Sequence, residues 1–301
     1  MSDSFYVSGW VADPEAVEGV VAAQPFKSFS ETEAGSAFSA KALPDHVYLW
    51  DAARKATGSL LPSRSQGTVG SCVSFGTVRA IEYTMVCEQA SGQPEEFKDL
   101  ATEVTYGGSR VEVGKGRLGR GDGSIGAWAA EFSKNWGVLA RGVYGEYDLT
   151  KYSESVCRKF GSSGVPDTLE TEARKHPVKA ITLVATWEEA KKALSSGYGI
   201  SVCSGQGFSM KRDSNGISQS SGKWAHCMCI CGYTTIDGKE YGRIDNSWGA
   251  KAHTGPTGPG EPGPEGFYAD ASVISRMLAE KDSWAFSSVE GFPVKSIDWF
   301  M

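Results

Sequence analysis

The sequence predicts an α+β protein in which a helical lobe and a strand-rich lobe share a cleft. Two observations support this fold class. Apolar residues in the first half of the 301-residue chain repeat every three to four positions, as they do on helices. The second half changes to short runs that alternate or are rich in β-forming residues, which is typical of strands. A chain of this length can bury one large core or two smaller ones.

Three segments are predicted to be helices. The first begins near Ser71, which can cap it, and its apolar positions are Phe75, Val78, Ile81, Met85 and Val86. The others cover residues 124–137 and 186–197, and the second of these ends on Gly197, a common C-terminal residue. The predicted strands are residues 198–204, 225–235, 239–248 and 266–273. Residues 253–266 are predicted to be a Pro/Gly loop, because their glycines lack the three-residue register of collagen.

The two ends of the chain differ in composition from the part between them. Residues 1–42 form an arm rich in Ser, Ala, Gly and Glu, which we expect to be extended. Residues 281–301 form an aromatic tail that we expect to pack on the body, on a neighbouring subunit or in the cleft. The main domain is therefore placed at residues 43–280, with a helical lobe at about 43–150 and a strand-rich lobe at about 151–280. An assembly partner is expected to bind through the arm or the tail.

Composition and charge exclude several classes of function. The net charge of −6 and the pI near 5.4 argue against nucleic acid as a ligand, because phosphate binding needs a basic surface. No apolar run approaches the roughly 20 residues of a membrane span, and no signal peptide is seen. Seven irregularly spaced cysteines without a C-x-x-C pair indicate reduced thiols. We therefore expect a cytoplasmic protein, or part of a particle assembled inside the cell, without membrane contact.

Cys72 lies where a polar, glycine-containing loop meets the first predicted helix. Backbone N–H groups and the helix dipole stabilise a thiolate there, so its pKa is expected below the roughly 8.5 of a free thiol. A small core cysteine is the alternative. A thiolate nucleophile needs an imidazole that is itself fixed by a further group, and His226 and Asn246 begin stretches on two successive strands. Gln66 precedes the cysteine, where its amide can donate to an oxyanion.

The order and the residues of these stretches resemble the sequence motifs of the papain family of cysteine peptidases. The family's stretch around the nucleophile is similar to SQGTVGSCVSFG, its histidine strand to AHCMCICGY and its asparagine motif to DNSWG. The start of the family's mature domain is similar to LPDHVYLWD, its stretch along the cleft to DGSIGAWAAEF, and its closing strand to EGFYAD. The resemblance runs from about Leu43 to Val273. It implies a papain-like fold with a helical lobe, an antiparallel β-barrel-like lobe and an active site in the cleft between them.

By this resemblance the protein is a thiol hydrolase that cleaves peptide bonds in a peptide or protein substrate, without a cofactor or a metal. Cys72 is then the nucleophile, His226 the acid and base, and Asn246 the residue that orients the imidazole. Gln66 is the oxyanion donor. The residues implied at the substrate are Gly123, Ser124 and Trp248, and the last also covers the hydrogen bond between histidine and asparagine.

Several positions depart from the family pattern. Val69 replaces a cysteine, which removes a disulfide, and Val73 replaces the tryptophan after the nucleophile. Ser124 replaces a second glycine, so a substrate backbone is expected to approach less closely. The arm is far shorter than the inhibitory propeptide of lysosomal relatives, which argues against zymogen control of that kind.

Two alternatives to a peptidase remain open. Another acyl transfer, such as transglutamination or deamidation, uses the same residues. A structural subunit of a large assembly, for example a virion, that keeps a papain-like body also agrees with the added arm and tail. Product analysis separates the first alternative, because only a peptidase releases new α-amines.

Other motifs are interpreted as structural. The stretch GKGRLG is interpreted as a glycine-rich surface loop rather than a nucleotide site, because no helix follows at the right distance. Cys227, Cys229 and Cys231 alternate along one strand and are expected in the core rather than on a metal. The remaining histidines are expected to be solvated; they are His46, His176 and His253.

Overall fold

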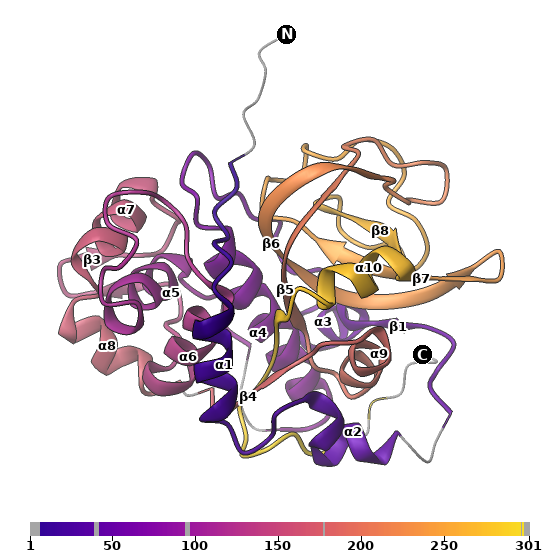
Figure 1. Cartoon of the computed structure of the whole chain (residues 1–301), viewed down its shortest axis with the longest axis horizontal. Coiled ribbons are helices and arrows are strands. Elements are labelled where there is room, and N and C mark those ends of the chain that lie inside the picture. The colour runs from indigo at the N-terminus through magenta and orange to yellow at the C-terminus, as the bar shows by residue number, and fades with distance from the viewer. Residues whose placement is uncertain (1–6, 39–41, 94–96, 177, 296, 298–301) are drawn as a thin grey trace, which may run out of the picture.

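The structure, a computed structural model, describes residues 7–38, 42–93, 97–176, 178–295 and 297. A lobe of helices lies beside a lobe built around a β-sheet (Figure 1). The α-helices of the protein are α1 (Pro14–Ala22), α2 (Glu33–Ala37), α3 (Leu49–Thr57), α4 (Cys72–Ala90), α5 (Thr102–Gly108), α6 (Gly126–Trp136), α7 (Glu154–Ser163), α8 (Asp167–Ala173), α9 (Trp187–Ser195) and α10 (Ala271–Leu278). Its strands are β1 (Val47–Tyr48), β2 (Val143–Tyr144), β3 (Tyr147–Asp148), β4 (Ala180–Leu183), β5 (Ile200–Phe208), β6 (Ser220–Ile236), β7 (Lys239–Asp245), β8 (Gly266–Asp270) and β9 (Asp282–Ser287). The architecture is the α+β, two-lobed one that the sequence predicts.

Helix α4 is the central element of the molecule. It begins at Cys72, and every residue from there to Glu88 is buried, so the helix is covered on all sides rather than amphipathic as predicted. It packs against α3, α5 and α6 and also against β5, β6 and β9. Because both lobes contact this helix, its first residue lies where they meet.

The helical lobe has an apolar core of its own. Helices α5, α6, α7 and α8 contribute to it, and its buried residues include Val104, Phe132, Phe160 and Leu169. The side chain of Ser153 starts α7 by accepting the Val156 N–H as an N-cap. Since α7 and α8 follow residue 150, the helical lobe continues past the boundary expected there, to Ala173.

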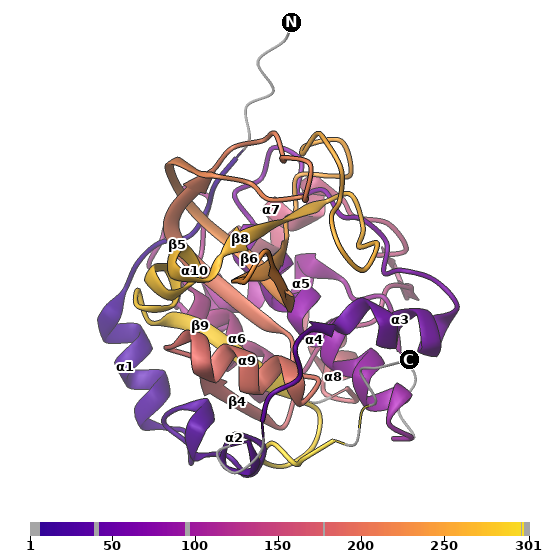
Figure 2. The same ribbon diagram turned by 90° about the vertical axis from the view of Figure 1, so that its right-hand side faces the viewer.

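The strands of the second lobe form one antiparallel sheet in the order β4-β9-β5-β6-β7-β8, with β1 paired to β6. The longest strand, β6, has 17 residues and pairs with both β5 and β7. Helices α9 and α10 pack against these strands (Figure 2). In the part of the chain that the structure describes, the path is open, so the barrel-like lobe implied by the resemblance is an open sheet.

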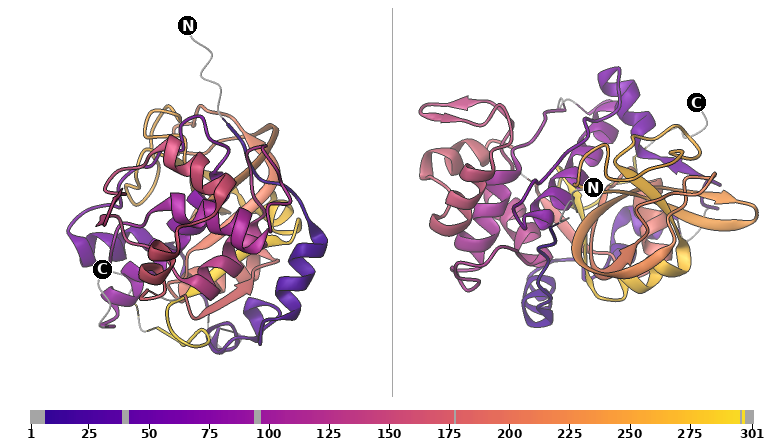
Figure 3. Two further views of the ribbon diagram at one scale, coloured as in Figure 1. Left: turned by 90° about the vertical axis from the view of Figure 1, so that its left-hand side faces the viewer. Right: turned by 90° about the horizontal axis from the view of Figure 1, so that it is seen from above.

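The N-terminal arm contains helices, which corrects the expectation of an extended segment. Asp13 caps α1 by accepting the Ala16 N–H, and Pro14 takes the first helical position, where a missing N–H leaves no acceptor unsatisfied. Helix α1 packs on α6, and α2 packs on α9. The residues before α1, numbers 7–11, run between the two lobes (Figure 1 and Figure 3).

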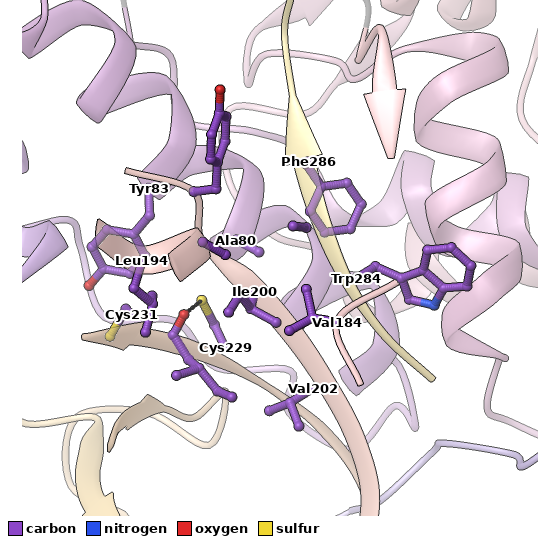
Figure 4. Close-up of a cluster of buried hydrophobic side chains, with 14 of the residues drawn as sticks. Ala80, Tyr83, Val184, Leu194, Ile200, Val202, Cys229, Cys231, Trp284 and Phe286 are labelled. Atoms are coloured by element: carbon purple, nitrogen blue, oxygen red, sulfur yellow. Dashed lines mark hydrogen bonds between the residues drawn. The ribbon is translucent and has the colours of Figure 1, made fainter. Parts of the chain in front are cut away.

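The aromatic tail supplies an interior strand of the sheet. Strand β9 lies between β4 and β5, and its Trp284 and Phe286 are buried close to β5 and α4 (Figure 4). Phe292 contacts Phe29 of the arm edge-on, with ring centroids 5.5 Å apart. The expectation that this segment packs on the body is therefore confirmed, although it is part of the sheet rather than an appended tail. Residues 298–301 lie outside the described residues.

Two further features are the state of the cysteine thiols and the apolar length of the helices. All seven cysteines are free thiols and all are buried. Those of β6 lie in apolar clusters, as expected. None of the helices within the described ranges is long and apolar enough to cross a membrane.

Phe286 offers a test of the interior position of β9, because its side chain is 1 % exposed. Phe286→Ala is expected to lower the free energy of unfolding by about 3–5 kcal/mol, since it leaves a cavity inside the core. Val143→Ala is the control, because Val143 is 66 % exposed, and its expected change is below about 0.5 kcal/mol. Urea unfolding measures both. Equal losses in the two variants would contradict a buried β9.

Candidate active site

The loop before α4 is fixed to the strand-rich lobe. The Gln66 N–H donates to the Ser247 carbonyl at 2.8 Å, and Ser65 forms an isolated bridge with Trp248. Cys72 then begins α4, where the first N–H groups of a helix have no acceptor within the helix. Its exposed fraction is 0 %. The sulfur therefore lies at a helix N-terminus but out of contact with bulk water.

His226 on β6 and Asn246 directly after β7 meet because these strands are antiparallel neighbours. His226 Nε2 and Asn246 Oδ1 are 2.8 Å apart. The Ser247 backbone N–H also donates to this Oδ1, at 2.7 Å, and a backbone donor identifies its partner as the amide oxygen. Because an oxygen can only accept here, Nε2 of the histidine carries the ring proton and Nδ1 carries the lone pair.

The Cys72 thiol lies beside the residue that follows His226 on β6. Nδ1 of His226 is buried and has no hydrogen-bond partner among the residues the structure describes. The Cys72 thiol lies beside the backbone of Cys227, the next residue along β6. Chemically, the arrangement offers a proton donor and a proton acceptor in one buried site. The described part of the chain has no group of three or more side chains arranged to hold a metal ion.

Aromatic rings cover the pair of His226 and Asn246. The Trp248 ring stacks on the His226 ring with centroids 4.4 Å apart, and Trp224 contacts Trp248 edge-on at 4.7 Å. An apolar cover lowers the local dielectric constant and strengthens the hydrogen bond beneath it. The stacked Trp248 ring therefore covers the hydrogen bond between His226 and Asn246.

The Gln66 side chain points its amide N–H groups at two peptide carbonyls. Nε2 donates to Val69 at 2.9 Å and to Val7 of the arm at 3.0 Å, while Oε1 accepts from Ser247 Oγ at 2.7 Å. Trp248 Nε1 donates to the same Val7 carbonyl at 3.1 Å. Two side-chain donors thus converge on one peptide carbonyl, which belongs to the arm in this structure.

A stretch of the arm, residues 7–11, lies across the site, and we call it the cleft segment. The N–H groups of Gly9 and Trp10 donate to the Ala225 carbonyl at 3.0 and 2.9 Å. Ser124 binds the segment from the other lobe, because its N–H donates to the Gly9 carbonyl at 2.7 Å and its carbonyl accepts a segment N–H at 2.9 Å. The segment therefore bridges both lobes as an extended peptide (Figure 1).

Glycines allow this close approach. A Cβ on Gly9 would lie 1.9 Å from the Gly70 carbonyl oxygen, and one on Gly123 would lie 2.8 Å from the Gly9 carbonyl oxygen. Gly123 also has a φ of +111°, which side-chain-bearing residues rarely adopt. Ser124 Oγ pairs with Ser109 Oγ inside the helical lobe at 2.8 Å. A serine at this position therefore lets the backbone of the cleft segment approach.

Burial sets the protonation states of the site. It raises the pKa of Cys72 far above its usual value, and the nearby backbone groups oppose this only in part. It lowers the pKa of His226 to about 4, although the hydrogen bond to Asn246 acts in the other direction. At neutral pH the covered site holds a neutral thiol and a neutral imidazole. The expected low pKa of Cys72 is wrong for this state, because no water solvates a thiolate here.

His253, expected to be solvated, is buried and contacts the site. Asn246 Nδ2 donates to His253 Nε2 at 3.1 Å, so the amide is held at both ends by an imidazole. Burial and the charges of Arg212 and Arg243 lower the pKa of His253 to about 3, so at neutral pH it accepts rather than donates at Nε2. A histidine in a Pro/Gly loop carries no sequence signal for this contact.

Known proteins are similar to this chain in sequence. A sequence model described as papain family cysteine protease matches residues 48–256. The chain belongs to the papain family. Cysteine proteinase 1 of Entamoeba histolytica is 27% identical over 218 residues, which are 68% of this chain and 59% of that protein. The match thus spans less than two thirds of the relative's length.

Solved structures share the fold. Xylellain, a cysteine protease from Xylella fastidiosa, gives a TM-score of 0.63 at 17% identity, over 94% of this chain and 96% of its own. The digestive procathepsin L2 proteinase of the Tenebrio molitor larval midgut gives 0.58 at 14% identity, over 94% and 78%. These likenesses confirm the papain-like, two-lobed α+β fold.

Acid is expected to destabilise the protein through its two buried histidines. The folded-state pKa values of His226 and His253, about 4 and 3, lie below the usual 6.5. Below pH 6.5 the unfolded chain therefore binds more protons than the folded protein. The free energy of unfolding is highest above pH 6.5 and decreases as the pH falls towards 4. His253→Gln is expected to reduce the dependence of the unfolding free energy on pH by roughly 1 kcal/mol per pH unit near pH 5.5.

Urea unfolding at a series of pH values from 5 to 7 measures this dependence. His46→Gln is the control, because its ring is partly exposed. A pH dependence that is the same in wild type and His253→Gln would contradict a buried, neutral His253.

Proposed function

We propose that the protein is a thiol peptidase in which Cys72 is the nucleophile and His226 transfers the proton. The observation that carries the proposal is the 2.8 Å hydrogen bond from His226 to Asn246, which leaves Nδ1 as the acceptor. Membership of a family of cysteine proteases supports the same roles. Asn246 orients the ring, and Gln66 with the Cys72 N–H binds the oxyanion.

In the first step, the Cys72 thiol gives its proton to Nδ1 of His226 and the sulfur bonds to the carbonyl carbon. The oxyanion accepts from Gln66 Nε2 and from the Cys72 N–H, and one such donor contributes about 10²–10³-fold in rate. The imidazolium then protonates the departing amine, which leaves a thioester. Water that gives a proton to the same imidazole attacks the thioester and regenerates the thiol.

The substrate of the proposed reaction is an extended peptide. The cleft segment is itself an extended peptide, and backbone groups of Ser124 and Ala225 bind it from the two lobes. Contacts to the main chain do not depend on side-chain identity, so the cleft is suited to many peptides. Gln66 and Trp248 add donors to a further peptide carbonyl, that of Val7. A substrate uses the same groups once the segment has left.

The same contacts make the covered state a latent one. The cleft segment covers the thiol and occupies the Gln66 amide that an oxyanion needs. The arm reaches across both lobes. Control by an N-terminal segment is therefore part of the proposal.

One added methyl group tests the latency. In Gly9→Ala the new Cβ would lie 1.9 Å from the Gly70 carbonyl oxygen, a backbone atom. Each 1.4 kcal/mol of strain in the covered state favours the open state about tenfold, so iodoacetamide is expected to alkylate Cys72 at least about 10-fold faster. Gly19→Ala in α1 is the matched control, because a Cβ there meets nothing within 4 Å. Equal alkylation rates in the two variants would contradict a cleft held closed by the segment.

The reaction class is tested on the full-length Gly9→Ala protein. With an unfolded protein as substrate, this variant is expected to release new α-amino groups, and the double variant with Cys72→Ala is expected to release none. Mass spectrometry of the products makes the distinction. Amine incorporation or deamidation at glutamine without chain cleavage would replace the peptidase by another acyl transfer. No product at all from a folded variant would favour the structural subunit.

A further inference from the structure

The loop between β7 and β8, residues 246–265, brings His253 to the site. His253 is buried, and its ring packs on the Phe267 ring with centroids 4.7 Å apart. Its Nε2 accepts from Asn246 Nδ2 at 3.1 Å. The proposed mechanism gives this imidazole no role, although it contacts the residue that orients His226.

Two buried arginines, Arg212 and Arg243, hold this loop from the inside. The guanidinium group of Arg212 donates to the His253 carbonyl at 3.3 Å and to the Gly255 carbonyl at 2.7 Å. The other carbonyls that the two arginines bind are those of Thr257, Gly263, Pro264 and Gly266. These bonds go to the main chain, so they fix the backbone at His253 whatever its side chain is.

Stability does not explain a histidine at this position. Nδ1 of His253 is buried and has no hydrogen-bond partner among the residues that the structure describes. Because Nε2 accepts, Nδ1 carries the proton of the neutral ring. A buried N–H without an acceptor is unfavourable, and an apolar ring on Phe267 would avoid it. A polar group that is kept in spite of such a cost indicates a functional role.

The orientation of the Asn246 amide decides which nitrogen of His226 can act as a base. In the observed orientation Oδ1 accepts from His226 Nε2 and from the Ser247 N–H, which leaves the lone pair of His226 on Nδ1. A half-turn of the amide would point its NH₂ group at His226 Nε2 and move the ring proton to Nδ1. Nδ1 could then no longer accept the proton of the Cys72 thiol.

His253 stabilises the observed orientation, because it gives the buried NH₂ group of Asn246 an acceptor. Burial and the charges of the two arginines keep this imidazole neutral and therefore able to accept. Without His253 the NH₂ group would be unpaired, and the half-turn would pair it with His226 instead. The Ser247 N–H opposes the half-turn, so it limits the effect without removing it.

We propose that His253 is a positioning residue, which keeps the Asn246 oxygen on His226 Nε2 and thereby keeps Nδ1 of His226 as the proton acceptor. This inference rests on the proposed function. His253 acts through the Asn246 amide, whereas a merely structural histidine acts only through its packing on Phe267. The loop that the two arginines hold then has a function, which is to bring an acceptor to that amide.

Two substitutions of His253 in the full-length Gly9→Ala protein separate these roles, with fluorescein-labelled casein as the substrate. His253→Phe keeps a ring on Phe267 but loses the acceptor, so kcat is expected to fall at least about 10-fold while KM changes less than about 2-fold. His253→Gln keeps an acceptor, its amide oxygen, and is expected to restore kcat to within about 3-fold of the parent.

Trp187→Phe in the same protein is the matched control. It replaces one aromatic ring by another and loses a 2.8 Å hydrogen bond to Glu240, which is remote from Asn246. Its kcat is expected to equal that of the parent. Equal losses of kcat in the control and in His253→Phe would assign the effect to general destabilisation and overturn the inference.

A second measurement needs no peptide cleavage. Nitrogen NMR of the full-length protein labelled with ¹⁵N-histidine reports which ring nitrogen of His226 carries the proton, and His226→Gln identifies its signals among those of the four histidines. The fraction of His226 with its proton on Nδ1 is expected to rise about 10-fold in His253→Phe and less than about 3-fold in His253→Gln. A change in packing alone leaves this fraction as it is in wild type.

The outcomes separate this inference from the proposed function. A His226 tautomer that is the same in wild type and His253→Phe overturns the inference, as does equal kcat in His253→Phe and His253→Gln, and both leave the peptidase standing. If the Gly9→Ala protein does not cleave casein, the proposed function fails, and the tautomer alone decides whether His253 positions Asn246. If His253→Phe does not fold, His253→Leu removes the acceptor with a smaller side chain and takes its place in both measurements.

Discussion

The close contact between α4 and the sheet is the constraint on which the site depends. A Cβ on Gly76 would lie 2.7 Å from Cys227 Sγ, and one on Gly199 would lie 2.4 Å from the Ala80 carbonyl oxygen. Glycine at both positions lets the helix and the strands approach more closely than side chains allow. The first residue of α4 thereby reaches the strand that carries His226. A wider helix–sheet spacing would separate the thiol from the imidazole, whatever the two residues were.

The burial that results from this packing also decides which protonation states the site can hold. Without water, a neutral thiol and a neutral imidazole are more stable than an ion pair, as the raised pKa of Cys72 and the lowered pKa of His226 express. When the cleft segment leaves, hydration lowers the first pKa and raises the second. The two values then approach each other, and proton transfer from sulfur to nitrogen becomes less unfavourable. Under the proposed function, the segment therefore controls the chemistry through polarity as well as through access.

The sequence could predict the parts that local patterns encode. Helices α4, α6 and α9 and strands β5 to β8 form where periodicity predicts them, and the strand pairing brings His226 to Asn246. The remaining features depend on tertiary contacts that leave no local pattern. Strand β9 resembles a tail in the sequence because its neighbours β4 and β5 are distant in the chain. His253 contacts the site through the path of its loop, and Trp10 finds its partner in Asp282, 272 residues away.

A tethered segment competes with substrate at its own effective concentration, about millimolar for a short flexible tether. A substrate binds only the open fraction of the molecules, so every apparent dissociation constant rises by the reciprocal of that fraction. The factor is common to all peptides and cancels in any ratio between two of them. Under the proposed function, the backbone contacts of Gly9 and Ser124 therefore set how much activity the chain has. A change in these contacts therefore alters the activity towards every peptide by the same factor and leaves the preference between two peptides unchanged.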